Sequence, residues 1–157
     1  MGTTTFSGPV KAGPLSQSTG STADTKANVG SAVLSQSASF TQAGAVDPGV
    51  NTDIVLPPNS QIVAITFYVS AAFDTGTTLV DVGWVGPDGI VIPTSLVDDL
   101  DLAATGYHTA TPGTNTSIAA NWINSGDTDK MIVITSSATG DGAAHIVVEY
   151  VQSNNLT

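Results

Sequence analysis

The segment SQIVAITFYVS (residues 60–70) decides the fold class of this chain. Its apolar and β-branched residues alternate with a period of two, which is typical of a β-strand with two different faces. One face comprises Val63, Ile65, Phe67 and Val69, and the other comprises Ile62, Ala64, Thr66 and Tyr68. The pattern predicts a central strand that is buried on the first of these two faces.

Similar short apolar runs recur along the chain and are separated by turn sequences such as VDPG (46–49) and GPDG (86–89). In these turns Pro restricts φ and Gly accepts positive φ. The other predicted strands are 31–40, 52–59, 78–85, 90–92, 117–123, 130–137 and 144–152. The spacing predicts an all-β domain over residues 31–157, a jelly-roll or Greek-key β-sandwich of about eight strands, with immunoglobulin-like topology as the alternative.

One segment, TSLVDDLDLAA (94–104), has helical rather than strand periodicity. Ser95 precedes Asp98 by three residues, as in a capping box, and Leu96, Leu100 and Ala103 recur at helical spacing. We therefore expect one short helix or ordered loop inserted in the sandwich.

Residues 1–30 are rich in Ser, Thr, Gly and Ala and show no sustained period, as expected of an extended N-terminal arm or linker. The composition is compatible with a disordered tail and with an arm that becomes ordered on a partner. The stretch TTTFSGPVKAGPL (3–15) carries spaced apolar residues and two Gly-Pro pairs. The candidate partner-binding residues of this arm are Phe6, Pro9, Val10, Pro14 and Leu15.

Composition limits the classes of partner. The 157 residues include 13 acidic residues and only three lysines, with no arginine, for a net charge of −10. Nucleic-acid binding requires Lys and Arg against phosphate, so we expect neither nucleic acid nor an anionic membrane as a partner. No apolar run approaches the roughly 18–20 residues of a membrane-spanning helix and no export signal is evident, so we expect a soluble protein. The absence of cysteine excludes disulfides and thiol catalysis.

The chain lacks a recognisable catalytic constellation. Its two histidines, His108 in a predicted loop and His145 on a predicted strand, are not accompanied by a G-x-S-x-G nucleophile motif. The stretch GDGAAH (140–145) resembles part of a dinucleotide fingerprint, but it lies between two predicted strands and is interpreted as a hairpin turn. We expect no enzymatic activity and no cofactor, and an esterase or glycosidase is only a third-ranked hypothesis.

Two acidic groups and two tryptophans have alternative interpretations. Asp98, Asp99 and Asp101, and separately Asp127 and Asp129, could offer oxygen ligands to Ca²⁺, but neither group has EF-hand spacing, so solvated turn acids are the favoured interpretation and no metal site is assigned. Trp84 and Trp122 lie on predicted strands, and we expect them to anchor the core or an interface.

Several stretches together resemble small capsid decoration, or cement, proteins of tailed bacteriophages, many of them marine, which begin with T-T-x-F-S-G-P-V/I-x-x-G. The matching stretches are TTTFSGPVKAGP (3–14), NVGSAVLSQS (28–37), VLPPNSQIVAITFYV (55–69) and HIVVEYVQ (145–152). The resemblance implies a β-sandwich that forms homotrimers at three-fold positions on the outer capsid surface of the virion, after synthesis in the host cytoplasm.

The implied partners are the major capsid protein and other copies of this chain. The implied function is structural: the trimer binds the outside of an icosahedral capsid and stabilises the expanded shell. Our own hypothesis is that Phe6, Val10 and Leu15 are the apolar anchors of the arm. The alternative is a virion-surface receptor- or glycan-binding β-sandwich, such as a head fibre or adhesin, because fold alone does not separate the two functions.

Overall fold

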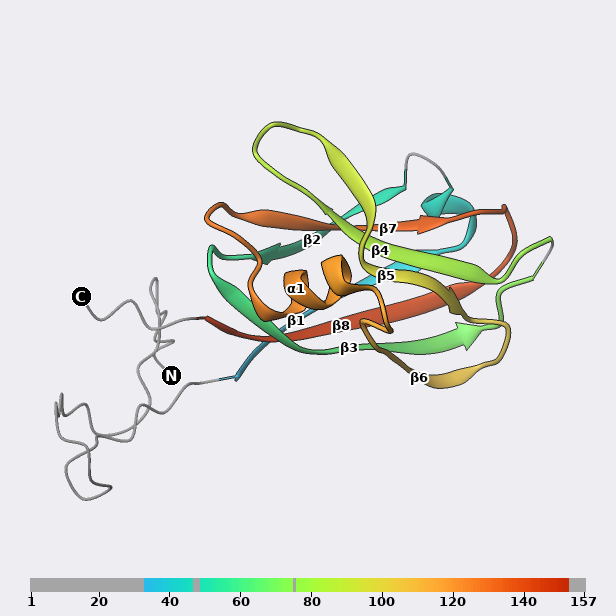
Figure 1. Cartoon of the computed structure of the whole chain (residues 1–157). Coiled ribbons are helices and arrows are strands. Elements are labelled where there is room, and N and C mark those ends of the chain that lie inside the picture. Colours follow the sequence, from blue (N-terminus) through green and yellow to red (C-terminus); the bar gives the residue numbers. More distant parts are fainter. Residues whose placement is uncertain (1–32, 47–48, 75, 153–157) are drawn as a thin grey trace, which may run out of the picture.

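A computed structural model describes residues 33–46, 49–74 and 76–152, which form two facing antiparallel sheets of four strands each (Figure 1). The first sheet has the order β1 (Val33–Thr41), β8 (Ala143–Gln152), β3 (Ser60–Ala71) and β6 (Gly106–Ala110). The second has the order β2 (Val50–Leu56), β7 (Lys130–Ser136), β4 (Leu79–Val85) and β5 (Val91–Asp101). A short 3₁₀ helix, η2 (Ala43–Ala45), follows β1, and one α-helix, α1 (Thr116–Ile123), lies between β6 and β7.

The strand pairing identifies the topology. β1 pairs with β8, β2 with β7, β3 with β6 and β4 with β5, all antiparallel. Successive strands alternate between the two sheets, except that β4 and β5 form a hairpin within the second sheet. This nested pairing is the arrangement of an eight-stranded jelly roll. The predicted all-β sandwich is therefore confirmed, and the order selects the jelly roll among the predicted topologies.

The strand 60–70 that indicated the fold class is β3, which lies between β8 and β6 as a central strand. Ile65, Phe67 and Val69 are buried, as predicted. The predicted positions of Ile62 and Val63 were exchanged: Ile62 is 4% exposed and Val63 48% exposed. The cause is a register shift against β8 between Ile62 and Ala64, because one extra residue in a strand reverses the faces beyond it.

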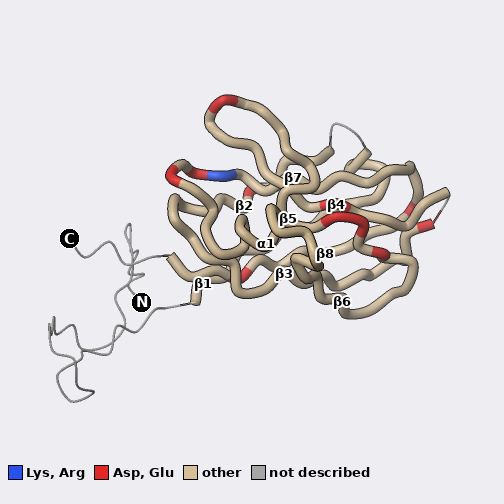
Figure 2. Tube along the Cα trace, in the orientation of Figure 1, with Lys and Arg blue, Asp and Glu red and all other residues tan. Residues whose placement is uncertain are grey.

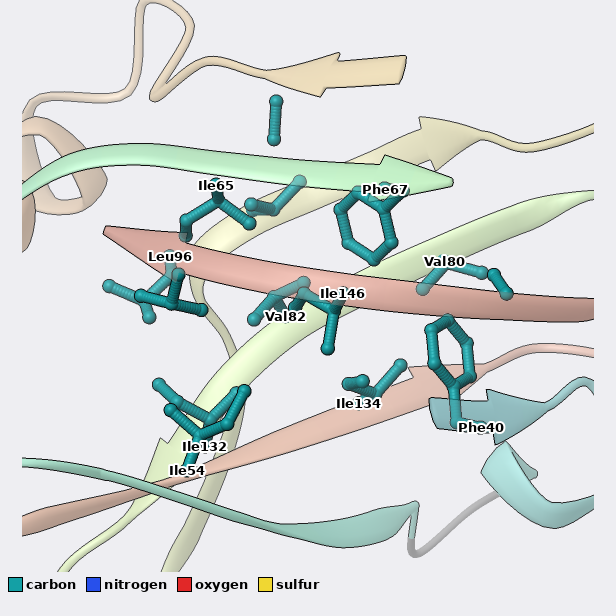
Figure 3. Packing of buried hydrophobic residues seen from close by; sticks show 14 of the residues in the cluster. Phe40, Ile54, Ile65, Phe67, Val80, Val82, Leu96, Ile132, Ile134 and Ile146 are labelled. Carbon is teal, nitrogen blue, oxygen red and sulfur yellow. The ribbon is translucent and has the colours of Figure 1, made fainter. Parts of the chain in front are cut away.

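The core fills the space between the two sheets (Figure 3). Ile65, Phe67 and Ile146 of the first sheet face Val82 and Ile134 of the second (Figure 3). At one end of this layer the rings of Phe40 and Phe73 lie with their centroids 5.9 Å apart, and Phe40 also meets the edge of Phe67 at 6.1 Å. Burial of these apolar groups supplies the main stabilisation of the sandwich.

The predicted helix at 94–104 was wrong, because most of this segment belongs to strand β5. Two irregularities in β5 explain the misleading periodicity. Val82 pairs with Val97 and Trp84 with Ile92, so residues 93–96 lie opposite the single residue Gly83. Extra residues disturb the period of two, and they bring Leu96 and Val97, which are adjacent in sequence, into the buried layer together.

The helix of the domain lies instead at 116–123, where a strand was predicted. The side chain of Asn115 caps α1 by accepting hydrogen bonds from the backbone N–H groups of Ser117 (3.0 Å) and Ile118 (3.3 Å). Strand β6, which contains His108, was not predicted. The number of strands is still eight, because β6 is gained and the predicted strand 117–123 is a helix. In the VDPG turn, Gly49 has the expected positive φ of 92°, and Asp47 and Pro48 lie outside the described residues.

Helix α1 and the irregular part of β5 stabilise each other. The side-chain amide of Asn121 donates to the carbonyl of Ser95 (2.9 Å), and the indole N–H of Trp122 donates to the carbonyl of Leu96 (2.8 Å). These two carbonyls belong to the residues around which β5 leaves its regular pairing with β4. The helix thus supplies hydrogen-bond partners for backbone groups near the bulge.

Candidate interaction sites

The predicted arm residues Phe6, Pro9, Val10, Pro14 and Leu15 lie outside the described residues. The described chain begins at Val33 of β1 and runs to Gln152 of β8, and Val33 pairs with Val151. The described chain therefore starts and stops at the same end of the sandwich (Figure 1).

The β4–β5 hairpin is an exposed apolar feature that projects beyond the two sheets (Figure 1). The turn predicted at 86–89 is confirmed, because the N–H of Gly89 donates to the carbonyl of Gly86 (3.0 Å) and Gly89 has a positive φ of 76°. Beyond the turn, Ile90 is 62% exposed, Val91 37% and Ile92 50%. These exposed aliphatic side chains offer apolar surface to a partner, although Val91 points to the face opposite to that of Ile92.

The base of this hairpin is held firmly. Trp84 is buried, as predicted for a core anchor, and the ammonium of Lys130 lies 5.8 Å from the centroid of its ring. At Gly83 the backbone of β5 approaches so closely that a Cβ atom would overlap the Ile92 carbonyl oxygen. The aliphatic residues 90–92 are thus presented beside a fixed base rather than on a loose loop.

A second candidate site lies on the outer face of the first sheet. Tyr68 of β3 pairs directly with Tyr107 of β6, and these side chains are 61% and 72% exposed. His145 of β8 pairs with Tyr68, and Ser39 of β1 pairs with His145. Directly paired residues share a face, so Ser39, His145, Tyr68 and Tyr107 form one row across all four strands. We call this row the tyrosine row.

A shallow hollow of about 280 Å³ adjoins the tyrosine row. Its polar lining comes from Ser39, Thr41, Tyr68, Ser70 and His145. Nδ1 of His145 lies 3.0 Å from the hydroxyl of Ser39, which fixes the imidazole ring. As predicted, His145 lies on the face opposite to buried Ile146. The missed strand β6 explains why the sequence pattern did not bring Tyr107 and Tyr68 together.

The acidic residues are grouped differently from the prediction. Asp98 and Asp99 of β5 lie opposite Asp81 of β4, and one carboxylate oxygen from each lies within 4.8 Å of the others. The backbone N–H of Asp99, which has a positive φ of 58°, donates to Asp81 (2.8 Å). Asp101 is instead bonded to the hydroxyl of Thr78 and the N–H of Ala103. A divalent cation would find oxygen ligands at Asp81, Asp98 and Asp99.

The environment of these carboxyl groups shifts two pKa values in opposite directions. Partial burial raises the pKa of Asp81, and the neighbouring charges of Asp99 and Asp98 add to this effect. The hydrogen bonds from Thr78 and Ala103 hold the pKa of Asp101 below its usual value.

The charged residues of the described chain lie mainly outside the first sheet (Figure 2). Its four strands contain a single charged side chain, that of Glu149. Across the described residues, the helices are too short and insufficiently apolar to cross a membrane.

Comparison with known proteins gives no relative at the sequence level: no protein-family model matches the chain, and no curated protein matches it. Two solved structures have similar chains. A chain of the capsid of Ralstonia phage GP4 is similar with a TM-score of 0.56 and 19% identity, over 80% of this chain and 86% of that one. A chain of the Cyanophage Pam1 capsid asymmetric unit is similar with a TM-score of 0.50 and 17% identity, over 89% of this chain and 99% of that one. The protein therefore shares its jelly-roll fold with chains found in phage capsids.

Proposed function

We propose that this protein is a structural component of a phage virion that binds the outside of an icosahedral capsid as a homotrimer and stabilises the expanded shell. The observation that carries the proposal is the exposed apolar hairpin, presented from a jelly roll whose fold recurs in chains of two phage capsids. The resemblance of the opening sequence to capsid decoration proteins supports the same role.

The contact with the shell combines two elements. The β4–β5 hairpin offers Ile90, Val91 and Ile92 to an apolar recess of the major capsid protein. The arm adds Phe6, Val10 and Leu15, and its Gly-Pro pairs favour an extended strand that can pair with a sheet edge of a neighbour. Three copies in a trimer multiply these modest contacts through avidity.

Stabilisation then follows from linkage. A protein that binds the expanded shell, but not the unexpanded one, shifts the equilibrium towards the expanded state by its binding free energy. The chain carries a net charge of −10, so the bound protein has little affinity for the packaged DNA. The role is structural and requires no catalytic group.

Co-sedimentation tests this function directly. The full-length protein is mixed with expanded heads and with unexpanded procapsids of the phage that carries the gene, both stripped of this protein. We expect saturable binding to expanded heads in multiples of three copies per three-fold position, and higher melting temperatures of the loaded heads. Equal binding to both particles, or none to either, would contradict the proposal.

Limited proteolysis tests the contribution of the arm. Trypsin has only three lysines to cleave, Lys11, Lys26 and Lys130. If the arm lies on the shell, cleavage at Lys11 and Lys26 slows on the loaded heads relative to the free protein. Unchanged cleavage at both positions would show that the arm does not contact the shell. This result would not contradict the hairpin contact.

A further inference from the structure

We propose that the outer face of the first sheet binds a neutral oligosaccharide, with Tyr68 and Tyr107 as the stacking platform. The proposal goes beyond the structural role and does not depend on it. Tyr68 and Tyr107 pair across β3 and β6 and are 61% and 72% exposed, so both rings are available to a ligand. A sugar ring has an apolar C–H face and a polar rim, which match the apolar ring and polar tip of tyrosine.

The groups beside Tyr68 suit the hydroxyls of such a ligand. The hollow of about 280 Å³ is lined by the polar residues Ser39, Thr41, Ser70 and His145, by Tyr68, and by the apolar residues Phe40, Ala143 and Ala144. Hydroxyl and imidazole groups both donate and accept hydrogen bonds, as sugar hydroxyls do. The bond between Ser39 and His145 (3.0 Å) holds the imidazole in place and reduces the ordering required on binding.

The charge of this face selects an uncharged ligand. Among the described strands β1, β3, β6 and β8, only Glu149 is charged. It is four residues from His145 along β8, a separation of about 13 Å at the usual rise of a strand. A phosphorylated, sulfated or sialylated ligand would need a cation beside the rings, and these strands contain neither Lys nor Arg. A neutral sugar needs none.

The length of the tyrosine row favours a chain of sugars over a single ring. Four neighbouring strands contribute one residue each, and adjacent strands lie about 4.8 Å apart, so the row spans about 14 Å. One ring stacked on the tyrosines leaves room for the next unit beside the Ser39–His145 pair.

A glycan array of neutral oligosaccharides of glucose, galactose, mannose and N-acetylglucosamine tests the site, with sialylated and sulfated glycans as charged controls. We expect the full-length protein to bind at least one neutral oligosaccharide and none of the charged ones. Calorimetry with the strongest hit should show binding weakened about tenfold or more in Tyr68→Ala and in Tyr107→Ala. Tyr68→Phe keeps the ring and should retain most of the affinity.

Val63→Ala is the matched control, because Val63 is an exposed residue of the same strand and should leave the affinity unchanged. Thermal unfolding verifies that each variant is folded. Absence of binding to every neutral glycan, or full binding by Tyr68→Ala, overturns the proposal. A smaller oligomer for the tyrosine variants in light scattering would also overturn it, because the row would then be a subunit contact. Co-sedimentation with heads reports separately on the structural role.

Discussion

At the residue scale, Gln42 is a buried polar side chain that connects three parts of the chain. It is 0% exposed and follows β1. Its side-chain N–H groups donate to the carbonyls of Asp74 (2.6 Å) and Thr77 (3.4 Å). Its Oε1 accepts from the backbone N–H groups of Asp74 (3.0 Å) and Gly142 (3.3 Å). The amide thus joins the β3–β4 and β7–β8 connections to the end of β1.

Replacing Gln42 with Ala should destabilise the protein by about 3 kcal/mol, because several buried backbone groups lose their partners. The measurement is the free energy of unfolding from urea denaturation. Gln61→Ala is the control, since Gln61 is exposed on β3 and its removal should change stability by no more than about 0.5 kcal/mol. Equal effects of the two substitutions would show that the connections do not depend on Gln42.

The carboxyl group of Asp81 makes a contribution to folding stability that depends on pH. Burial raises the pKa of the Asp81 carboxyl group in the folded state. At pH values between the usual and the raised pKa, the folded protein therefore binds more protons than the unfolded chain. The Asp81 contribution to stability therefore decreases as pH rises from below its usual pKa through the raised one. This is the opposite of a carboxylate whose pKa is lowered by a hydrogen bond, such as that of Asp101.

Asp81→Asn should therefore stabilise the protein at pH 7 by about 0.5 kcal/mol, a small value because the site is partly exposed to solvent. The asparagine oxygen can still accept the bond from the Asp99 N–H. At about pH 3 the difference from the natural protein should disappear. Thermal unfolding at both pH values provides the measurement, with exposed Asp53→Asn as the control. A variant that is less stable at pH 7 would contradict this account.

At the element scale, strand β5 is irregular at the base of the projecting hairpin. Residues 93–96 lie opposite Gly83, and only a residue without a Cβ atom fits beneath the Ile92 and Pro93 backbone. Gly83→Ala should destabilise the protein by about 3 kcal/mol or more, measured by urea denaturation. Gly86→Ala is the control, because its Cβ would meet only the side-chain ends of Asp88 (3.1 Å) and Lys130 (3.3 Å). Similar stabilities would show that the close approach at Gly83 is not required.

The aliphatic residues that follow the hairpin turn should matter for binding and not for folding. The double substitution Ile90→Ser and Ile92→Ser removes exposed apolar surface, so the melting temperature should change by no more than about 2 °C. Binding to expanded heads should weaken about tenfold or more, through loss of buried apolar area. Val63→Ser, an exposed substitution on the other sheet, should bind normally. Full binding by the double variant would exclude the hairpin from the interface.

Regular strands could be predicted from the sequence, and elements defined by long-range contacts could not. The strands β1, β3 and β4 were correctly predicted, because each has one face against the core. β5 was predicted as a helix because its bulges disturb the alternation. The Asn115 cap and the adjacent alanines 119 and 120 were the available signals for α1, but the run SIAANWI was interpreted as an apolar strand.

The candidate sites could also be predicted only in part, because they depend on contacts between distant parts of the sequence. The GPDG turn and the aliphatic run after it were visible in the sequence, but their projection beyond the sandwich is a feature of the three-dimensional arrangement. The tyrosine row depends on pairing between residues 39, 68, 107 and 145, which only the jelly-roll topology brings together. The arm residues Phe6, Pro9, Val10, Pro14 and Leu15 remain a sequence-based prediction.

At the scale of the whole molecule, the jelly roll separates two surfaces with different chemistry. The described chain starts and stops at one end of the sandwich, and the apolar hairpin projects beyond the sheets. The nearly uncharged outer face of the first sheet presents Tyr68 and Tyr107.

A density map of the intact phage particle tests the central claim most directly. The account predicts three copies of this jelly roll around each three-fold position on the outside of the expanded shell. In that density, Ile90 and Ile92 should contact the major capsid protein. Absence of the protein from the outer surface, or attachment with the hairpin pointing into solvent, would contradict the account.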